Sequence, residues 1–265
     1  MADLQDVWAA GSTYERFMGR WSRQLAPLFA SWLQVPAGAH WLDVGCGTGA
    51  MTDAICRQAE PASVLGCDPA ESFIEYARRH VPHRHASFAV AGSGCLPRRA
   101  GGYGSVTSLF ALNFLPDPVG GLREMRELAA PGGAVSACVW DYAGGMEFLR
   151  RFWDEAVAMD AAAQAHDEGT RFPLCRPEAL TDAFRSAGLT DVRCGPIDIT
   201  TAFADFEDYW QPFLGGVGPA PSYVASLRPD RLALLEARLR QGLPRGPGGA
   251  IHLGARAWAV SGTAD

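Results

Sequence analysis

The sequence LDVGCGTGA, at residues 42–50, joins a short apolar run to three closely spaced glycines. Gly45, Gly47 and Gly49 would let the backbone turn tightly and approach a ligand, and the N-terminus of a following helix would favour a negative group there. With Ala50 the glycines also satisfy the G-x-G-x-x-G/A pattern of dinucleotide sites. The glycines therefore predict a nucleotide-type ligand without deciding which one.

Asp43 discriminates between the possible ligands. It lies inside the expected strand 41–44, just before Gly45. A carboxylate would repel a pyrophosphate bound at this loop, but it would attract a ligand that carries an ammonium group. Asp68, which ends the next expected strand, suits a ribose diol in either case. S-adenosylmethionine fits this combination, because it has an ammonium, a sulfonium and no phosphate.

Strands alternate with helices around this loop. We expect strands at 41–44, 63–68, 87–92, 105–112 and 134–141, and helices at 48–59, 69–80 and 119–129. This alternation predicts an α/β fold with a doubly wound parallel sheet and right-handed crossovers. After Asp141 we expect helices at 146–163, 177–188 and 229–243, with strand regions at 189–200 and 250–263. Apolar residues spaced by three and four also predict an amphipathic helix over 14–33.

The change of rhythm after Asp141 suggests how the chain is organised. We expect one domain over residues 1–265. Its core would cover about 34–141, 176–200 and 250–262, and a helical cap would be built from about 1–33, 142–175 and 203–245. The aromatic residues of the cap would either line an acceptor site or form the cap's own core, and core packing is the favoured interpretation. These residues are Phe203, Phe206, Tyr209, Trp210 and Phe213.

Five segments, in order, carry a family resemblance over most of residues 40–141. They are LDVGCGTG, VLGCDPAESFIEYAR, SLFALNFLPDP, EMRELAAPGG and AVSACVWD. As a set they resemble class I S-adenosylmethionine-dependent methyltransferases, and YERFMGRWSR (14–23) with ARAWAVSGT (255–263) is similar to a small-molecule branch of that family. The resemblance implies a Rossmann-like seven-stranded sheet whose last strand is antiparallel. It also implies S-adenosyl-L-methionine as cofactor and S-adenosyl-L-homocysteine as product.

The resemblance further implies which residues contact the cofactor. Asp43 and the glycines would line its methionine end, Asp68 would hold the ribose hydroxyls, and Pro69 and Phe73 would lie near the adenine. The expected cofactor residues are Asp43, Gly45, Cys46, Gly47, Gly49, Asp68, Pro69, Phe73, Gly92, Ser93 and Leu109.

A second glycine-containing stretch, FAVAGSGCLP (88–97), looks at first like another nucleotide loop. In the resembled family, a strand end of the form GDAxxLP supplies an acidic side chain to the adenine amino group. Aligned on Leu96 and Pro97, this chain has Gly92 where that Asp is expected, followed by Ser93. The stretch is therefore interpreted as one wall of the same site without its carboxylate. One lost hydrogen bond is worth about 0.5–1.5 kcal/mol, so cofactor binding should be retained.

Candidates on the acceptor side come from three regions of the chain. Asp141, Tyr14 and Asn113 are the catalytic candidates, with Asp141 as a hypothetical general base at the end of the fifth strand. The substrate candidates are Tyr14, Trp21, Asn113, Trp140 and Tyr142. For Tyr14 and Trp21, which lie on the apolar face of the first helix, core packing is an equal alternative. A base is needed only if the acceptor must lose a proton, because alignment and desolvation can supply much of the catalysis.

Composition narrows the class of partner. The net charge is −6 and the sequence lacks a marked Lys/Arg run, so a small-molecule acceptor is favoured over nucleic acid. No apolar run is long enough to cross a membrane and the N-terminus lacks signal-peptide features, so we expect a cytoplasmic protein, as a monomer or homodimer. Seven scattered cysteines without a C-x-x-C pair predict neither a disulfide framework nor a metal site.

Two main functions follow from these observations. The first is methyl transfer to a small molecule, expected to belong to secondary metabolism. The alternative is a methyltransferase-fold enzyme that binds the cofactor but catalyses a non-methylating reaction such as cyclisation. A non-enzymatic binding module is a third and weaker reading.

Overall fold

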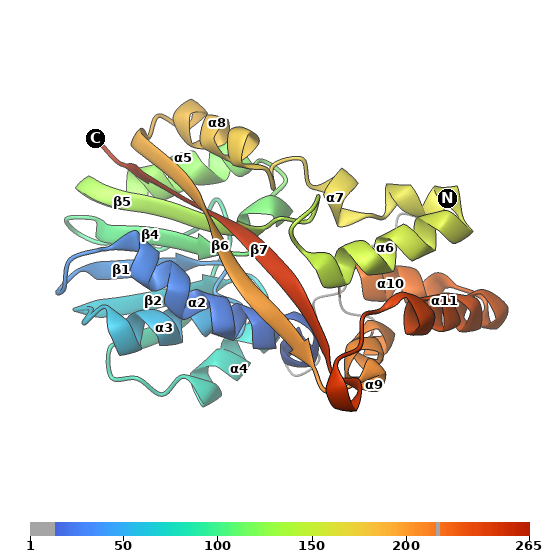
Figure 1. Cartoon of the computed structure of the whole chain (residues 1–265). Coiled ribbons are helices and arrows are strands. Elements are labelled where there is room, and N and C mark those ends of the chain that lie inside the picture. The colour runs from blue at the N-terminus through green and yellow to red at the C-terminus, as the bar shows by residue number, and fades with distance from the viewer. Residues whose placement is uncertain (1–13, 216–217) are drawn as a thin grey trace.

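A computed structural model describes residues 14–215 and 218–265, and it contains one seven-stranded sheet. The strand order is β3-β2-β1-β4-β5-β7-β6, and β7 runs antiparallel to both β5 and β6 (Figure 1). The predicted Rossmann-like sheet with an antiparallel last strand is therefore confirmed. The strands are β1 (His40–Val44), β2 (Ser63–Asp68), β3 (Ala86–Val90), β4 (Tyr103–Leu109), β5 (Ala129–Trp140), β6 (Thr190–Phe203) and β7 (Ile251–Thr263).

Helices cover both faces of this sheet. On one face α2 (Arg20–Leu33) packs on α3 (Ala50–Gln58), beside α4 (Glu71–His80); on the other, α5 (Pro118–Leu128) packs on α8 (Pro177–Ser186). A π-helical turn, η1 (Glu15–Gly19), precedes α2 and confirms the expected N-terminal helix. The strands between the two helical layers are rich in fully buried residues such as Leu42, Val106 and Val135, as expected for a parallel sheet covered on both faces.

Local differences from the expected boundaries have clear causes. β5 begins at Ala129, five residues before the expected start at 134, because Ala129 already pairs with Tyr103 of β4. Gly132 and Gly133 then bond to Ala264 beyond the end of β7, at N···O distances of 2.7 and 2.9 Å. Residues 130–133, which lie between the expected helix and the expected strand, are thus part of an irregular strand start.

The connection from β3 to β4, residues 91–102, contains no helix among the described residues, unlike the other crossovers in this part of the sheet. It is an open loop that runs from Ala91 past Leu96, whose side chain is buried. A short 3-10 turn, η2 (Leu112–Phe114), follows β4. Between β3 and β4 the chain is therefore held in place by loop contacts and not by the packing of a crossover helix.

A second group of helices lies beyond one end of the sheet, on the right of Figure 1, and we refer to them as the distal helices. The long strands β6 and β7 extend toward them as a two-stranded ribbon. The distal helices are α6 (Glu147–Met159), α7 (Glu168–Arg171), α9 (Phe206–Trp210), α10 (Pro219–Ser226) and α11 (Pro229–Gly242); the short turns η3 (Ala161–Ala165), η4 (Gln211–Gly215) and η5 (Pro247–Gly249) connect them.

The aromatic residues of the 203–213 region form the core of the distal helices. Phe152 and Phe213 stack with ring centroids 4.6 Å apart, and Tyr209 donates a hydrogen bond from its hydroxyl to the Phe148 carbonyl oxygen over 2.9 Å. All five aromatics named in the sequence are at most 5% exposed. The favoured interpretation, that these aromatics pack a core, agrees with this burial. No helix in the described part of the chain combines the length and apolar character needed to cross a bilayer.

We predict that Tyr209→Phe lowers the free energy of unfolding by about 0.5–1.5 kcal/mol, because it removes one buried hydrogen bond while keeping the packed ring. Chemical denaturation measures this change. The half-buried Tyr76 on α4 offers a matched control, because Tyr76→Phe should change stability by less than about 0.5 kcal/mol. A Tyr209→Phe variant with unchanged stability would argue against a structural role for this hydroxyl.

Candidate functional site

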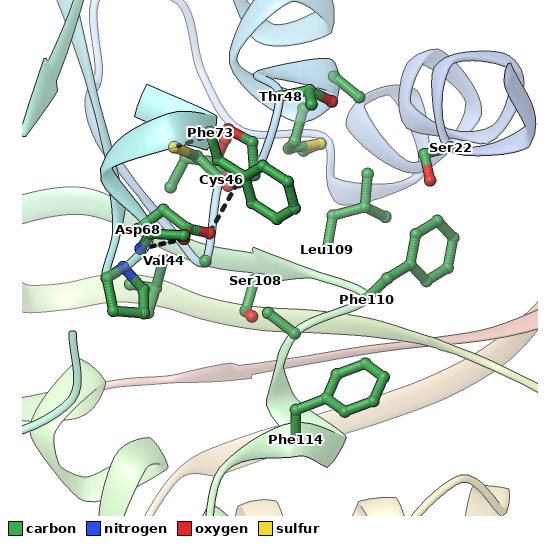
Figure 2. A pocket seen from close by; sticks show the side chains of 18 of the residues that line it. Ser22, Val44, Cys46, Thr48, Asp68, Phe73, Ser108, Leu109, Phe110 and Phe114 are labelled. Atoms are coloured by element: carbon green, nitrogen blue, oxygen red, sulfur yellow. Dashed lines mark hydrogen bonds between the residues drawn. The ribbon is translucent and has the colours of Figure 1, made fainter. Parts of the chain in front are cut away.

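A pocket lies at the carboxyl ends of β1, β2 and β4 and is closed on one side by the start of the N-terminal helix. This is the edge of an open α/β sheet where ligands usually bind. Figure 2 shows Asp68 and Phe73 toward one end of the pocket and Phe110, Phe114 and Ser22 toward the other. Of the residues expected at the site, the lining contains Tyr14, Asp43, Gly45, Cys46, Gly47, Asp68, Pro69, Phe73, Gly92, Ser93, Leu109, Trp140 and Tyr142.

The glycine loop is held against the end of β2. The Gly45 and Cys46 N–H groups both donate to the Cys67 carbonyl oxygen, at 2.8 and 2.9 Å. Gly45 has φ of +70°, and a Cβ on it would lie 2.3 Å from the Cβ of Ala111. A side chain at this position would therefore clash, in addition to the cost of a left-handed backbone. Gly47 has φ of +51° and faces open space, so its backbone is accessible to a ligand.

Asp68 links the two loops that follow β1 and β2. Its Oδ2 accepts from the Gly47 N–H at 3.0 Å and its Oδ1 accepts from the Ala70 N–H at 2.8 Å, the two dashed bonds at Asp68 in Figure 2. Burial raises the pKa of this carboxyl, and the two N–H donors oppose that shift. An ionised carboxylate has about four acceptor positions, so Asp68 can accept further hydrogen bonds from a ligand.

Asp43 is fully buried at the bottom of the pocket. Its Oδ2 accepts a 2.7 Å hydrogen bond from the Thr52 hydroxyl of α3, whereas its Oδ1 has no partner within the described residues. Burial raises the pKa of Asp43 to about 7, and the hydrogen bonds from Thr52 oppose the shift. A buried acceptor without a donor is costly, so this atom is prepared for a donor that comes from a ligand.

The N-terminal turn covers the pocket with Tyr14, Met18 and Ser22. The Tyr14 hydroxyl and the Ser22 hydroxyl are hydrogen-bonded at 3.1 Å, and the Tyr14 ring contacts that of Phe73 with centroids 5.7 Å apart. Burial raises the pKa of Tyr14 to about 12, so the phenol stays protonated at neutral pH. Tyr14 can therefore act as a hydrogen-bond donor but is a poor base.

Salt bridges fix this turn to the glycine loop. Arg23 donates to both carboxylate oxygens of Glu15, at 2.8 and 3.0 Å, and its guanidinium also donates to the Thr48 carbonyl oxygen at 3.3 Å. At the start of the same helix, Arg20 pairs with Asp208 of α9 at 2.9 Å. Arg20 and Arg23 thus connect the glycine loop with the distal helices.

The far end of the pocket is aromatic. Phe110 has φ of +60°, an uncommon left-handed conformation for a bulky residue, and its ring stacks on Trp140 with centroids 4.1 Å apart and planes 10° apart. Phe172, which follows α7, contacts the rings of both Phe114 and Tyr142 at centroid distances of 5.0 and 5.6 Å. A planar, apolar molecule would fit such a lining.

Four residues expected at the site do not line the pocket. Gly49 is the N-cap of α3, and Trp21 packs against Phe203 with centroids 5.3 Å apart. Asn113 is buried on η2, and its amide atoms have no partner in the described chain. Asp141 caps the turn after β5, where its carboxylate accepts from the Gly144 N–H at 3.2 Å.

Other lining residues were not anticipated from the sequence. They include Met18, Ser22, Thr48, Ala70, Ser108, Phe110 and Phe114. Phe110 and Phe114 directly follow the fourth strand, so the rule that ligands meet strand ends could have identified them. Within the described residues there is also no group of three or more His, Cys, Asp or Glu side chains that could hold a metal ion.

Known proteins resemble this chain in sequence and in fold. Residues 42–133 match the family model of a methyltransferase domain. The ubiquinone biosynthesis O-methyltransferase of Acinetobacter baumannii (strain AYE) is 25% identical over 205 residues, which cover 71% of this chain and 83% of that protein. The match therefore extends well beyond the glycine loop.

Two solved structures share the fold. The phosphoethanolamine N-methyltransferase 2 of Haemonchus contortus, in complex with S-adenosyl-L-methionine, has a TM-score of 0.58 and 14% identity, covering 96% of this chain and 57% of that one. The [4+2]-cyclase SpnF has a TM-score of 0.53 and 16% identity, with coverage of 91% and 80%. Residues 42–133 therefore form a methyltransferase domain, and the family model, the relatives and the sheet topology together support a class I S-adenosylmethionine-dependent methyltransferase.

Proposed function

We propose that this protein transfers the methyl group of S-adenosylmethionine to a small organic acceptor by in-line displacement. The acceptor atom forms a bond to the methyl carbon as the sulfur–carbon bond breaks, and S-adenosylhomocysteine is released. If the acceptor is a hydroxyl, its proton leaves to water. The observation that carries this proposal is the continuous pocket, in which Asp43, Gly47 and Asp68 lie at one part and an aromatic lining at another.

The polar groups of the pocket match those of S-adenosylmethionine. The Asp43 Oδ1 is buried without a described partner, which suits the ammonium of the methionine part, and Asp68 retains acceptor capacity for ribose hydroxyls. Gly45 and Gly47 have no side chains, so at these two positions the backbone is open to a ligand. When bound, the cofactor supplies an electrophilic methyl group on a sulfonium. The chain's own residues bind, orient and exclude water around it.

The acceptor end supports a planar and largely apolar substrate. Phe110, Phe114, Trp140 and Tyr142 line it, and the polar groups of the same pocket include the hydroxyls of Tyr14, Ser22, Ser108 and Tyr142. The relatives are named ubiquinone biosynthesis O-methyltransferases, which supports an oxygen nucleophile on a small molecule. More specifically, we propose that the acceptor is a small molecule of secondary metabolism. We further propose that the distal helices and the N-terminal helix act together as a cap over this end.

The first prediction concerns the reaction itself. With small aromatic alcohols as candidate acceptors, we expect S-adenosylhomocysteine and the methylated acceptor to form in equal amounts, measured by mass spectrometry. Consumption of a substrate by the cofactor-bound protein without S-adenosylhomocysteine formation would instead support the non-methylating alternative. Protein without added acceptor serves as the control for spontaneous cofactor breakdown.

The second prediction concerns the charge of Asp43. We expect Asp43→Asn to weaken cofactor binding about 10- to 100-fold, because it removes a charge-assisted hydrogen bond. In the unmodified protein, binding should strengthen as pH rises from 5.5 through the pKa of about 7, and this pH dependence should be absent from Asp43→Asn. Isothermal titration calorimetry measures both effects. Asp53→Asn, which alters a carboxylate paired with Arg57 outside the pocket, is the control.

The same carboxyl affects the stability of the ligand-free protein. The folded pKa of Asp43 lies above its unfolded value, so its contribution to stability is complete below about pH 4 and is lost as pH rises through about 7. We expect Asp43→Asn to flatten the unfolding free energy between pH 4 and 7. Equal slopes for the two proteins would contradict the raised pKa. Comparing the variants isolates Asp43 from Glu168, whose pKa burial also raises to about 7.

The third prediction concerns general-base catalysis by Asp141. Because its carboxylate caps a turn outside the pocket, we expect Asp141→Asn to reduce kcat by less than about threefold and to leave the pH profile unchanged. A loss of 100-fold or more, together with a missing ionisation in the pH–rate profile, would establish Asp141 as the base. Circular dichroism checks that the turn is retained.

A further inference from the structure

The loop after β3 contributes a serine to the pocket lining, and a carboxylate from another element accepts its hydroxyl proton. Gly92 and Ser93 line the pocket, and the Asp expected in this loop is absent. Glu124 of α5 extends to the same loop: its Oε2 accepts from the Ser93 hydroxyl at 3.1 Å and from the Gly94 N–H at 2.7 Å. Its Oε1 accepts from the Leu96 N–H at 3.2 Å.

These bonds tie an irregular loop to a neighbouring helix. Inside the loop the Cys95 N–H donates to the Gly92 carbonyl oxygen at 3.1 Å, whereas the Gly94 and Leu96 N–H groups donate to Glu124. The Glu124 carboxylate accepts three hydrogen bonds, and these hold residues 93–96 on α5. The close approach of the two segments is also seen at Gly121, where a Cβ would lie 3.9 Å from the Ser93 hydroxyl oxygen.

The arrangement decides how Ser93 can bind a ligand. A hydroxyl has one proton and two lone pairs, and an ionised carboxylate accepts only. The proton of Ser93 is donated to Glu124, so the hydroxyl can offer only lone pairs to the pocket. The Ser93 hydroxyl therefore offers the pocket a hydrogen-bond acceptor, as the side chain of the missing Asp would.

We propose that Ser93, polarised and oriented by Glu124, reads the exocyclic amino group of the adenine as a hydrogen-bond acceptor. Glu124 is a positioning residue, and Ser93 is the group that meets the cofactor. The inference rests on the proposed function for the presence of the cofactor in this pocket. It assigns the adenine specificity of the site to a pair of residues from two different elements.

The test compares two ligands that differ only at this amino group. They are S-adenosylhomocysteine and its 6-desamino analogue, in which a hydrogen replaces the amino group. For the unmodified protein we expect S-adenosylhomocysteine to bind about three- to tenfold more tightly, the value of one hydrogen bond. Calorimetry with both ligands gives this ratio directly, without any measurement of turnover.

The variants separate recognition from loop structure. In Ser93→Ala and in Glu124→Gln the ratio should fall toward one, although Glu124→Gln leaves the serine in place. Glu127→Gln is the matched control, because Glu127 lies on the same helix and pairs with Arg98 at the surface, and it should keep the ratio. If Ser93 and Glu124 only support the loop, their variants would weaken the binding of both ligands equally. The affinity ratio would then stay unchanged, and this result would overturn the proposal.

A rescue variant strengthens the test. A Cβ at Gly92 would meet Pro69 at 3.4 Å, an ordinary contact, and Gly92 does not have a positive φ. We therefore expect Gly92→Asp, added to Ser93→Ala, to restore the preference for the amino-bearing ligand, whereas a ratio that stays near one would argue against this adenine wall. If neither ligand binds the unmodified protein, the proposed function fails instead of this inference.

Discussion

The parallel pairing of β1 with β2 is the constraint on which the site depends. It sets Asp43 beside Gly66 and Val44 beside Cys67, so that the chain leaves both strands at the same edge. The backbone of Gly45 and Cys46 then bonds to the end of β2, and Asp68 bonds back to Gly47. Strand register together with these hydrogen bonds brings the two carboxylates and the glycine loop to one place.

Much of this arrangement could be predicted from the sequence because it is local. Asp43, the glycines and Asp68 lie on or next to strands with clear patterns, and the alternation of strands with helices indicates a parallel sheet with right-handed crossovers. The predicted start of β5 was wrong for a nonlocal reason. Ala129 pairs with Tyr103 of β4, and Gly132 and Gly133 form hydrogen bonds with Ala264 near the chain end. Periodicity within a segment carries no information about such pairings.

The acceptor side was less predictable for the same reason. Asp141 and Asn113 follow strand ends, as catalytic residues often do, yet a turn and a short 3-10 helix direct their side chains to positions outside the pocket lining. Phe110 fills that region through a left-handed backbone, which residue type would not suggest. Glu124 is one of several acidic residues on an amphipathic helix, and only the folded structure distinguishes it from Glu127.

The bond from Arg23 to the Thr48 carbonyl has a mechanical consequence. Arg23 also holds Glu15, so the turn that carries Tyr14 and the glycine loop form one connected piece. Because Arg20 of the same helix is joined to Asp208, this piece reaches α9 as well. If the N-terminal turn moves to open the pocket, either the Arg23 contact breaks or the glycine loop moves with the turn. The segment that covers the pocket is thus mechanically coupled to the loop that lines it.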